Sequence, residues 1–265
     1  MYGKLEIYNP TGSHKDRESE EIVRFARMNG YRTLAIASTG NAAISLAFYC
    51  YVYGLECHVY VSKGIEPERL AHIRAYHPII KLTDGTYDQA IAECQEHSER
   101  EGYLNCNPGA RHEKMVGDSR IGCELAHESK LDWVVCPTNN GTLIAGIWDG
   151  LKQVSASPRM VAAVTKKSKL AASITGFHRL EEPALSKCLE ESHGRTVEID
   201  DSEIPGAARL LLQDGLVVEG AAAASVACLK HLYLSQDSQV CCMITGNGLK
   251  FPGVMRELLA GPRIR

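Results

Sequence analysis

The sequence of 265 residues predicts an α/β protein built from parallel β-α-β units. Short apolar stretches typical of buried strands alternate along the chain with longer stretches of helical character. Three turns rich in Gly, Asn, Ser and Thr follow predicted strands, at 38–42, 138–142 and 245–248. Because open α/β sheets bind ligands at the carboxyl ends of their strands, these turns are candidate binding loops.

The first part of the chain contains four predicted β-α pairs. A strand-like run at 5–8 leads through a turn into a helix at about 16–29. The elements that follow are predicted strands at 33–37, 57–61, 79–82 and 103–106 and helices at 42–53, 68–76 and 87–101. The loop 107–112 breaks this alternation and is a candidate boundary. We therefore expect a smaller α/β lobe, residues 16–110, and a larger one, residues 1–15 plus 111–265.

The second part of the chain continues the alternation less regularly. Strands are predicted at 132–137, 160–164 and 239–244, and helices at about 113–129, 143–154, 202–215 and 220–234. Pro205-Gly206 is expected to interrupt one of these helices. The segment 165–195 is mixed and carries no clear periodicity.

Composition excludes several classes of function. A net charge of −3 gives no electrostatic reason to expect nucleic acid or an anionic membrane as a partner. No apolar stretch approaches the roughly 20 residues of a membrane span, and the first residues do not resemble a signal peptide. The ten cysteines lack a Cys-x-x-Cys pair and several lie in apolar runs, which indicates free thiols in a reducing cytoplasm. The scattered histidines have no companion ligands at metal-site spacing, so we expect no metal.

Lys15 lies in the turn Asn9-Pro10-Thr11-Gly12-Ser13-His14-Lys15-Asp16-Arg17. A lysine that forms a Schiff base needs a rigid, dry position, so that its amine loses its charge and attacks a carbonyl. The alternative interpretation is a surface lysine at the start of a helix with an acidic first turn.

The other turns supply complementary polar groups. The turn at 138–142 precedes a predicted helix, where backbone N–H groups bind anions and Gly141 permits close approach. It has neither a Walker pattern nor Gly-x-Gly-x-x-Gly, so a lone phosphate is favoured over a nucleotide, with a simple helix cap as the alternative. Ser38 and Thr39 are suited to a carboxylate, unless Ser38 merely caps the next helix. The Thr245 hydroxyl can bond a pyridine nitrogen without fixing a proton on it.

Five motifs, in this order, resemble fold-type II pyridoxal-phosphate enzymes of the tryptophan synthase beta-like superfamily, and among them the threonine synthase branch. They are Asn9–Arg17, Ser38–Ala43, Pro137–Leu143, Val218–Ala227 and Ile244–Lys250. The resemblance implies an α/β fold of two open, mostly parallel sheets with flanking helices. It also implies a shortened N-terminus, because family members usually carry several dozen residues before this lysine.

The same resemblance assigns roles to residues of the motifs. Lys15 would hold the aldehyde of pyridoxal 5'-phosphate and move substrate protons. Asn41 would bond the phenolic oxygen of the cofactor, and Thr245 would face its ring nitrogen. Glu219 would lie near the ring, or act only as a helix N-terminal acid. His14 replaces an aromatic residue, and either tunes the site or is a packed or solvated imidazole. The substrate carboxylate would contact Ser38, Thr39, Gly40 and Asn41, and the cofactor phosphate would contact Thr138, Asn139, Asn140, Gly141 and Thr142.

The implied function is a lyase or synthase acting on a small amino acid, in the manner of threonine synthase: O-phosphohomoserine would give threonine and phosphate. The alternatives are a serine/threonine dehydratase or a cysteine synthase-like enzyme, and a shortened, non-catalytic homologue that binds the cofactor. A homodimer is expected. Cationic residues available for a substrate phosphate are Arg17, Lys63, Arg69, Arg111 and Lys114. Gly220 departs from the proline common in this branch, and the phosphate turn is poorer in glycine than usual.

Overall fold

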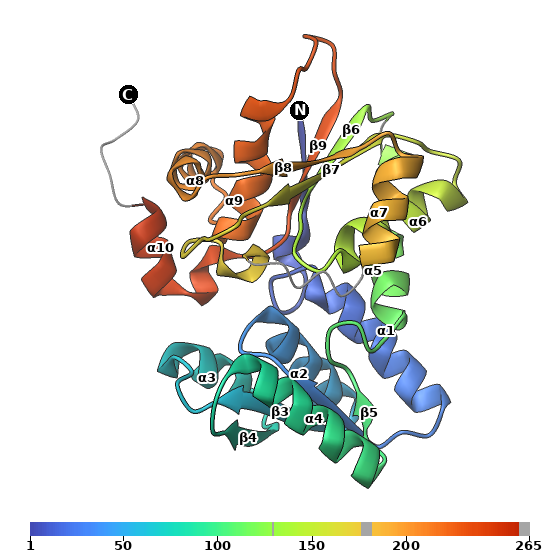
Figure 1. The fold of residues 1–265 in the computed structure, drawn as a ribbon, viewed down its shortest axis with the longest axis vertical. Coiled ribbons are helices and arrows are strands. Elements are labelled where there is room, and N and C mark those ends of the chain that lie inside the picture. The colour runs from blue at the N-terminus through green and yellow to red at the C-terminus, as the bar shows by residue number, and fades with distance from the viewer. Residues whose placement is uncertain (129, 176–181, 260–265) are drawn as a thin grey trace. The chain divides into compact units, whose positions relative to one another are not determined.

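The structure is a computed structural model that describes residues 1–128, 130–175 and 182–259 (Figure 1). The chain divides into two compact units. Unit 1 contains Met1–His14 and Asp118–Arg265, and unit 2 contains Lys15–Gly117. The second division point lies inside helix α5 (Glu113–Glu128), several residues beyond the loop that the sequence suggested as a boundary.

Unit 1 is built on a parallel five-stranded sheet with the strand order β1-β9-β6-β7-β8. The strands are β1 (Tyr2–Leu5), β6 (Trp133–Pro137), β7 (Arg159–Val164), β8 (Arg195–Glu198) and β9 (Val240–Ile244). Its helices, besides the C-terminal part of α5, are α6 (Thr142–Gln153), α7 (Glu182–Glu191), α8 (Ile204–Gln213), α9 (Gly220–Ala227) and α10 (Pro252–Leu259).

The two faces of this sheet are covered by different helices. Val135 and Cys242 pack into a core with residues of α8, α9 and α10. Their chain neighbours Val134 and Cys241 pack into a second core with residues of α5, α6 and α7. This alternation follows from the two-residue period of a strand, and burial on both faces explains why the central strands are continuously apolar.

Unit 2 is built on a parallel four-stranded sheet with the order β4-β3-β2-β5. Its strands are β2 (Thr33–Ala37), β3 (Glu56–Ser62), β4 (Ile79–Thr83) and β5 (Leu104–Asn105). Its helices are α1 (Lys15–Met28), α2 (Asn41–Tyr53), α3 (Pro67–Arg74) and α4 (Tyr87–Glu101), with the first turns of α5. Together the two units confirm the predicted α/β fold of two parallel sheets.

Several local predictions were wrong. Residues 6–8 form a 3₁₀ turn instead of a strand, because β1 pairs with β9 only as far as Leu5, opposite the last residue of β9. Pro205 stands at the start of α8, where a proline is tolerated, and does not interrupt the helix. The helix expected over 220–234 ends at Ala227 and continues as a 3₁₀ turn, Cys228–His231.

The segment 165–195, which the sequence left unassigned, contains α7 and the start of β8. Residues 176–181 of it lie outside the described residues. Helix α10 was also not predicted. In the part of the chain that the structure describes, no helix has the length and apolar character needed to cross a membrane.

The ten cysteines are all free thiols, and Cys123 is the least buried of them. Burial raises the pKa of Cys94, Cys188 and Cys228 to about 12, so these thiols stay protonated at neutral pH. We expect a thiol reagent at pH 7.5 to modify Cys123 first in the folded protein, and the others only after unfolding. Mass spectrometry after timed labelling checks this, with Cys123→Ser as the control. Equally fast labelling of Cys94 would contradict the packing described here.

Candidate active site

The turn before Lys15 is held rigidly within unit 1. Gly12 takes a positive φ of 77°, which favours glycine, and its N–H donates to the Asn9 carbonyl at 2.8 Å. Its carbonyl accepts from the N–H of Asn247 at 2.9 Å, and the N–H of His14 donates to the Thr245 carbonyl at 3.0 Å. The two motifs that follow β1 and β9 are therefore joined into one structure at the carboxyl ends of these strands.

Lys15 itself is the first residue of α1 and of unit 2. Its side chain is 23% exposed, and its Nζ forms an ion pair with the carboxylate of Glu18, which is only 3% exposed. The carboxylate stabilises the positive charge on the amine, so Lys15 must lose a proton before it can attack an aldehyde.

The predicted phosphate turn forms the start of α6. Gly141 is the N-cap residue with a positive φ of 93°, and no side chain in the described ranges caps the helix. Thr138 is engaged locally, because its hydroxyl donates to the Cys136 carbonyl at 2.9 Å. The hydroxyl oxygen of Thr142 and the side-chain oxygen of Asn139 are both buried without a hydrogen-bond partner among the described residues. Thr142 is only 2% exposed, so water cannot easily satisfy its hydroxyl.

This arrangement fits a phosphate group. The Thr142 hydroxyl can donate to a phosphate oxygen, and the first N–H groups of α6 have no acceptor within the helix. The amide of Asn139 can turn its NH₂ group toward the same anion. Gly141 is the N-cap residue, so the alternative interpretation, a simple helix cap, also describes this helix start, but it leaves the Thr142 hydroxyl without a partner among the described residues.

Replacing Thr142 by valine is expected to weaken cofactor binding without lowering the stability of the cofactor-free protein. The unloaded protein should be as stable as wild type or slightly more so, because the substitution removes an unpartnered buried hydroxyl and keeps the shape. Cofactor affinity should fall roughly ten- to hundred-fold, the worth of one hydrogen bond to a charged group. Thermal unfolding without cofactor and titration with cofactor measure the two effects. A variant that loses stability but binds cofactor normally would contradict this role.

The predicted carboxylate loop leads from β2 into α2 in unit 2. Gly40 is the N-cap residue, and Ser38 accepts a hydrogen bond from the Gly40 N–H at 3.3 Å. The prediction that Ser38 could cap the helix is therefore wrong, since its hydroxyl oxygen is used inside the loop. Asn41 is the first residue of α2, and Thr39 lies between these positions, so all four loop residues stand at the carboxyl end of β2.

Glu219 lies at the turn that contains Thr245. It is the residue before α9, and its N–H donates to the Gly246 carbonyl at 2.9 Å. Its carboxylate occupies the space that a side chain on Gly246 would need. The same carboxylate lies 3.4 Å from Nζ of Lys250, which also donates to the Gly12 carbonyl at 3.0 Å. The sequence analysis did not predict these contacts of Lys250, although Lys250 is the last residue of the fifth motif. His14 belongs to the same cluster, with Nδ1 3.4 Å from the Thr245 carbonyl.

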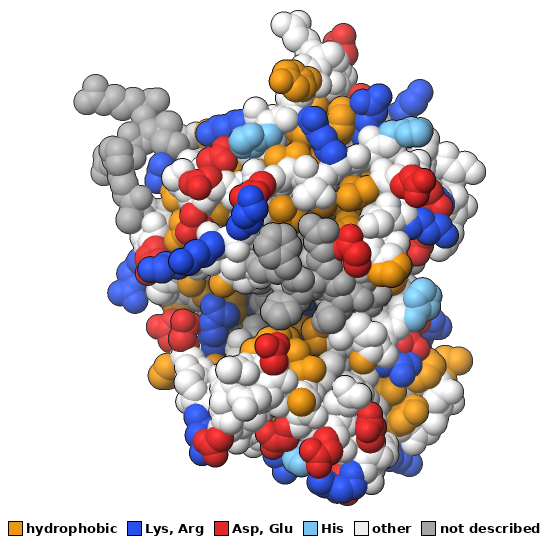
Figure 2. Space-filling model, in the orientation of Figure 1, with side chains coloured by type: hydrophobic (Ala, Val, Ile, Leu, Met, Phe, Trp, Pro, Cys, Tyr) orange, Lys and Arg blue, Asp and Glu red, His pale blue; other side chains and the backbone are white. Residues whose placement is uncertain are grey.

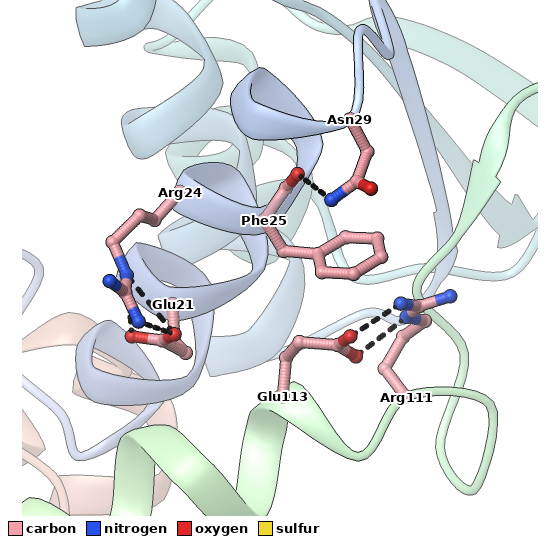
Figure 3. A network of polar contacts seen from close by, with 6 residues as sticks. All are labelled: Glu21, Arg24, Phe25, Asn29, Arg111 and Glu113. Atoms are coloured by element: carbon pink, nitrogen blue, oxygen red, sulfur yellow. Dashed lines mark hydrogen bonds and ion pairs between the residues drawn. The ribbon is translucent and has the colours of Figure 1, made fainter.

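Four of the five cationic residues proposed for a substrate phosphate have partners within unit 2, namely Lys63, Arg69, Arg111 and Lys114. Arg111 forms two hydrogen bonds to Glu113, at 2.8 and 2.6 Å, and lies over the ring of Phe25 on α1 (Figure 3). Lys63 pairs with Asp84, and Arg69 pairs with Glu66 at 2.8 Å. Lys114 is buried and donates to two backbone carbonyls. On the face drawn in Figure 2, basic and acidic side chains are interspersed.

Residues 1–246 match the family model described as pyridoxal-phosphate dependent enzyme. The chain belongs to this family. Its cofactor is accordingly pyridoxal 5'-phosphate, and the predicted fold-type II relationship is confirmed. Within the described residues, no group of three or more His, Cys, Asp or Glu side chains could hold a metal ion.

Known proteins of this pyridoxal-phosphate family resemble the chain over most of its length. A threonine synthase from Halalkalibacterium halodurans is 31% identical, with 95% of this chain and 78% of that protein covered. A threonine synthase from Methanocaldococcus jannaschii is 29% identical, with 95% and 71% covered. Among solved structures, maize serine racemase has a TM-score of 0.83 at 17% identity, covering 97% of this chain and 85% of its own. Threonine deaminase isoform 2 from Solanum lycopersicum has a TM-score of 0.84 at 19% identity, covering 97% and 78%.

Proposed function

We propose that this chain is a threonine synthase-like enzyme, which converts O-phosphohomoserine and water into threonine and phosphate. The observation that carries the proposal is the buried, unpartnered hydroxyl of Thr142 at a helix start, in a chain that also places Lys15 directly after a rigid turn. The printed names of the relatives, threonine synthases at 28–31% identity, favour this substrate over others.

Each candidate residue has a defined task in this proposal. Bound pyridoxal phosphate supplies an electron sink that stabilises negative charge on the carbons of the amino acid. Lys15 takes a proton from the substrate and returns it at another carbon. Thr245 offers a neutral partner to the ring nitrogen, and Asn41 donates to the phenolic oxygen. The turn of residues 138–142 holds the phosphate, and Ser38, Thr39, Gly40 and Asn41 hold the substrate carboxylate.

The two predicted lobes divide these tasks in our proposal. Residues 16–110 supply the carboxylate loop, and residues 1–15 plus 111–265 supply the phosphate turn and the ring-nitrogen partner. Glu219 acts near the ring through its contact with the Thr245 turn, and His14 supports the same turn. We also propose a homodimer in the cytoplasm. Ten free thiols are typical of a reducing compartment.

A second reaction class is supported by the solved structures. They include a threonine deaminase and a cysteine synthase, so a serine/threonine dehydratase or a cysteine synthase-like enzyme is the alternative. A non-catalytic homologue that binds the cofactor without turnover is the third candidate.

Assaying the cofactor-loaded protein with four amino acids distinguishes these functions. The panel contains O-phosphohomoserine, serine, threonine and O-acetylserine, with phosphate, threonine and 2-oxo acids as measured products. We expect phosphate and threonine in equal amounts from O-phosphohomoserine, and no comparable reaction with the others. Production of 2-oxo acid and ammonia from serine or threonine would identify a dehydratase, and consumption of O-acetylserine with sulfide a cysteine synthase. A cofactor absorption band without any turnover would identify the non-catalytic homologue.

A further inference from the structure

The end of strand β2 is held by side chains from two other segments of unit 2. Ala37 is the last residue of the strand and is fully buried. Its N–H donates to Oδ1 of Asn107 at 2.8 Å, and its carbonyl accepts from the hydroxyl of Tyr87 at 3.3 Å. The next residue, Ser38, begins the carboxylate loop, so these two bonds fix the point from which the loop starts.

Asn107 is itself fixed in orientation. Its Nδ2 donates to the Ile91 carbonyl on α4 at 3.2 Å, while its own N–H donates to the side chain of Asn105 at 2.9 Å. The side-chain amide therefore bridges α4 and β2, with oxygen toward a donor and nitrogen toward an acceptor. Only 3% of the residue is exposed, so water does not compete for these bonds.

The backbone of Asn107 is anchored as well. Nζ of Lys114, on the first turn of α5, donates to the carbonyls of Cys106 and Asn107 at 2.7 and 3.0 Å. The N–H of Cys106 donates to the Ala35 carbonyl at 2.8 Å, which continues the pairing of β5 with β2. A buried ammonium bonded to two carbonyls leaves this loop little freedom.

We propose that Asn107 is a positioning residue for the amino-acid carboxylate, acting through Ala37 on the loop of residues 38–41. The inference rests on the proposed function, because it assumes that this loop binds the carboxylate. Asn107 touches neither substrate nor cofactor in this scheme. Its contribution is to keep the loop donors in place before the ligand arrives, which lowers the cost of ordering them on binding.

Substitution of Asn107 by leucine removes both side-chain bonds and leaves the Ala37 N–H without its acceptor. A misplaced loop weakens interactions with the carboxylate and leaves interactions with the rest of the ligand intact. We expect affinity for an amino acid to fall roughly ten- to hundred-fold, because a misplacement of about 1 Å can cost up to about a hundred-fold. Affinity for the corresponding amine, which has no carboxylate, should change by no more than about two-fold, because this ligand makes no contact with the loop.

The experiment is a spectral titration of the pyridoxal-phosphate-loaded protein with two matched ligands, L-2-aminobutyrate and propylamine. The wild type should prefer the amino acid, and Asn107→Leu should lose most of that preference. Tyr87→Phe should lower the preference for the amino acid by a smaller amount, because the Tyr87 bond to Ala37 is longer than the Asn107 bond. This variant replaces Asn107→Leu in the test if the leucine variant does not fold. Ser98→Ala is the control, since it removes a buried bond to the Cys94 carbonyl within α4, leaves both bonds to Ala37 in place and should leave the ratio unchanged.

An unchanged ratio in folded Asn107→Leu, or in Tyr87→Phe when the leucine variant does not fold, would overturn the inference. An equal loss of affinity for both ligands would also overturn it, because that result indicates a general disturbance of the site. Failure of the proposed function looks different: the wild type would then show no absorption band with pyridoxal phosphate, or no preference for the amino acid over the amine.

Discussion

Lys15→Ala is expected to lower threonine formation by about three orders of magnitude or more, within the range reported for loss of a proton-transfer group. The reason is that Lys15 is both the nucleophile toward the cofactor aldehyde and the base that moves substrate protons in our proposal. Lys250 is the other lysine in the five motifs, and its Nζ lies 3.4 Å from the Glu219 carboxylate and donates to the Gly12 carbonyl. Steady-state turnover at saturating pyridoxal phosphate measures the effect.

Lys15→Arg is the informative companion to this variant. Arginine keeps the positive charge beside the buried carboxylate of Glu18, but it cannot lose its proton at neutral pH. It should therefore preserve the stability of α1 and be as inactive as the alanine variant. Lys152→Ala, which removes a half-exposed lysine paired with Asp149 and Glu191, should leave turnover unchanged. Turnover of either Lys15 variant within ten-fold of wild type would refute the assignment.

Gly150→Ala is expected to destabilise unit 1 by about 3 kcal/mol, because it forces two helix backbones apart. A methyl group on Gly150 of α6 would collide with the Ser119 carbonyl oxygen on α5 and come within 2.7 Å of its carbon. A methyl group on Gly122 of α5 would collide in the same way with the Ile147 carbonyl oxygen on α6. The backbone atoms involved cannot rotate aside as a side chain would, so the collision must move a helix.

Thermal unfolding of the cofactor-free protein measures this effect, and the melting temperature should fall by several degrees. The matched control is Gly206→Ala on α8. The described residues place no heavy atom within 4 Å of an added methyl group there, and the backbone has no positive φ. Alanine should then stabilise the helix by roughly 0.5–1 kcal/mol. Equal melting temperatures for the two variants would contradict the close approach of α5 and α6.

The regular part of the fold could be predicted from the sequence because each element there has clear boundaries. Strand β2 is an apolar run that ends at a polar turn, and its predicted range coincides with the observed one. Helix α4 is preceded by Thr86, whose side chain and that of Gln89 form a reciprocal cap, and is followed by Gly102, which has a left-handed backbone.

Other elements could not be predicted from their local sequence. Strand β8 is at the edge of its sheet and buries only Val197, so it lacks the apolar run that identifies central strands. The alanine-rich segment after Gly220 predicts a long helix by propensity, but the chain tightens into a 3₁₀ turn after Ala227. In both segments the observed structure depends on tertiary packing, which cannot be predicted from local composition.

The candidate site, too, could be predicted only in part from the sequence. Turn composition was sufficient to propose Thr142 and Thr245, because polar turns at strand ends are visible in the sequence. The contact of Lys250 with Gly12, and that of Asn107 with Ala37, join segments far apart in the chain. The pairing of Lys15 with Glu18 is local, but helix spacing alone did not indicate that the carboxylate would be buried. These supporting contacts needed the folded structure.

The central claim, that Lys15 carries the cofactor, is tested most directly by trapping the bond between them. The protein would be incubated with pyridoxal phosphate, reduced with borohydride, digested and mapped by mass spectrometry. We predict a single modified peptide with the cofactor on Lys15, and no modification without cofactor. A cofactor on any other lysine, or none after saturating incubation, would contradict the account.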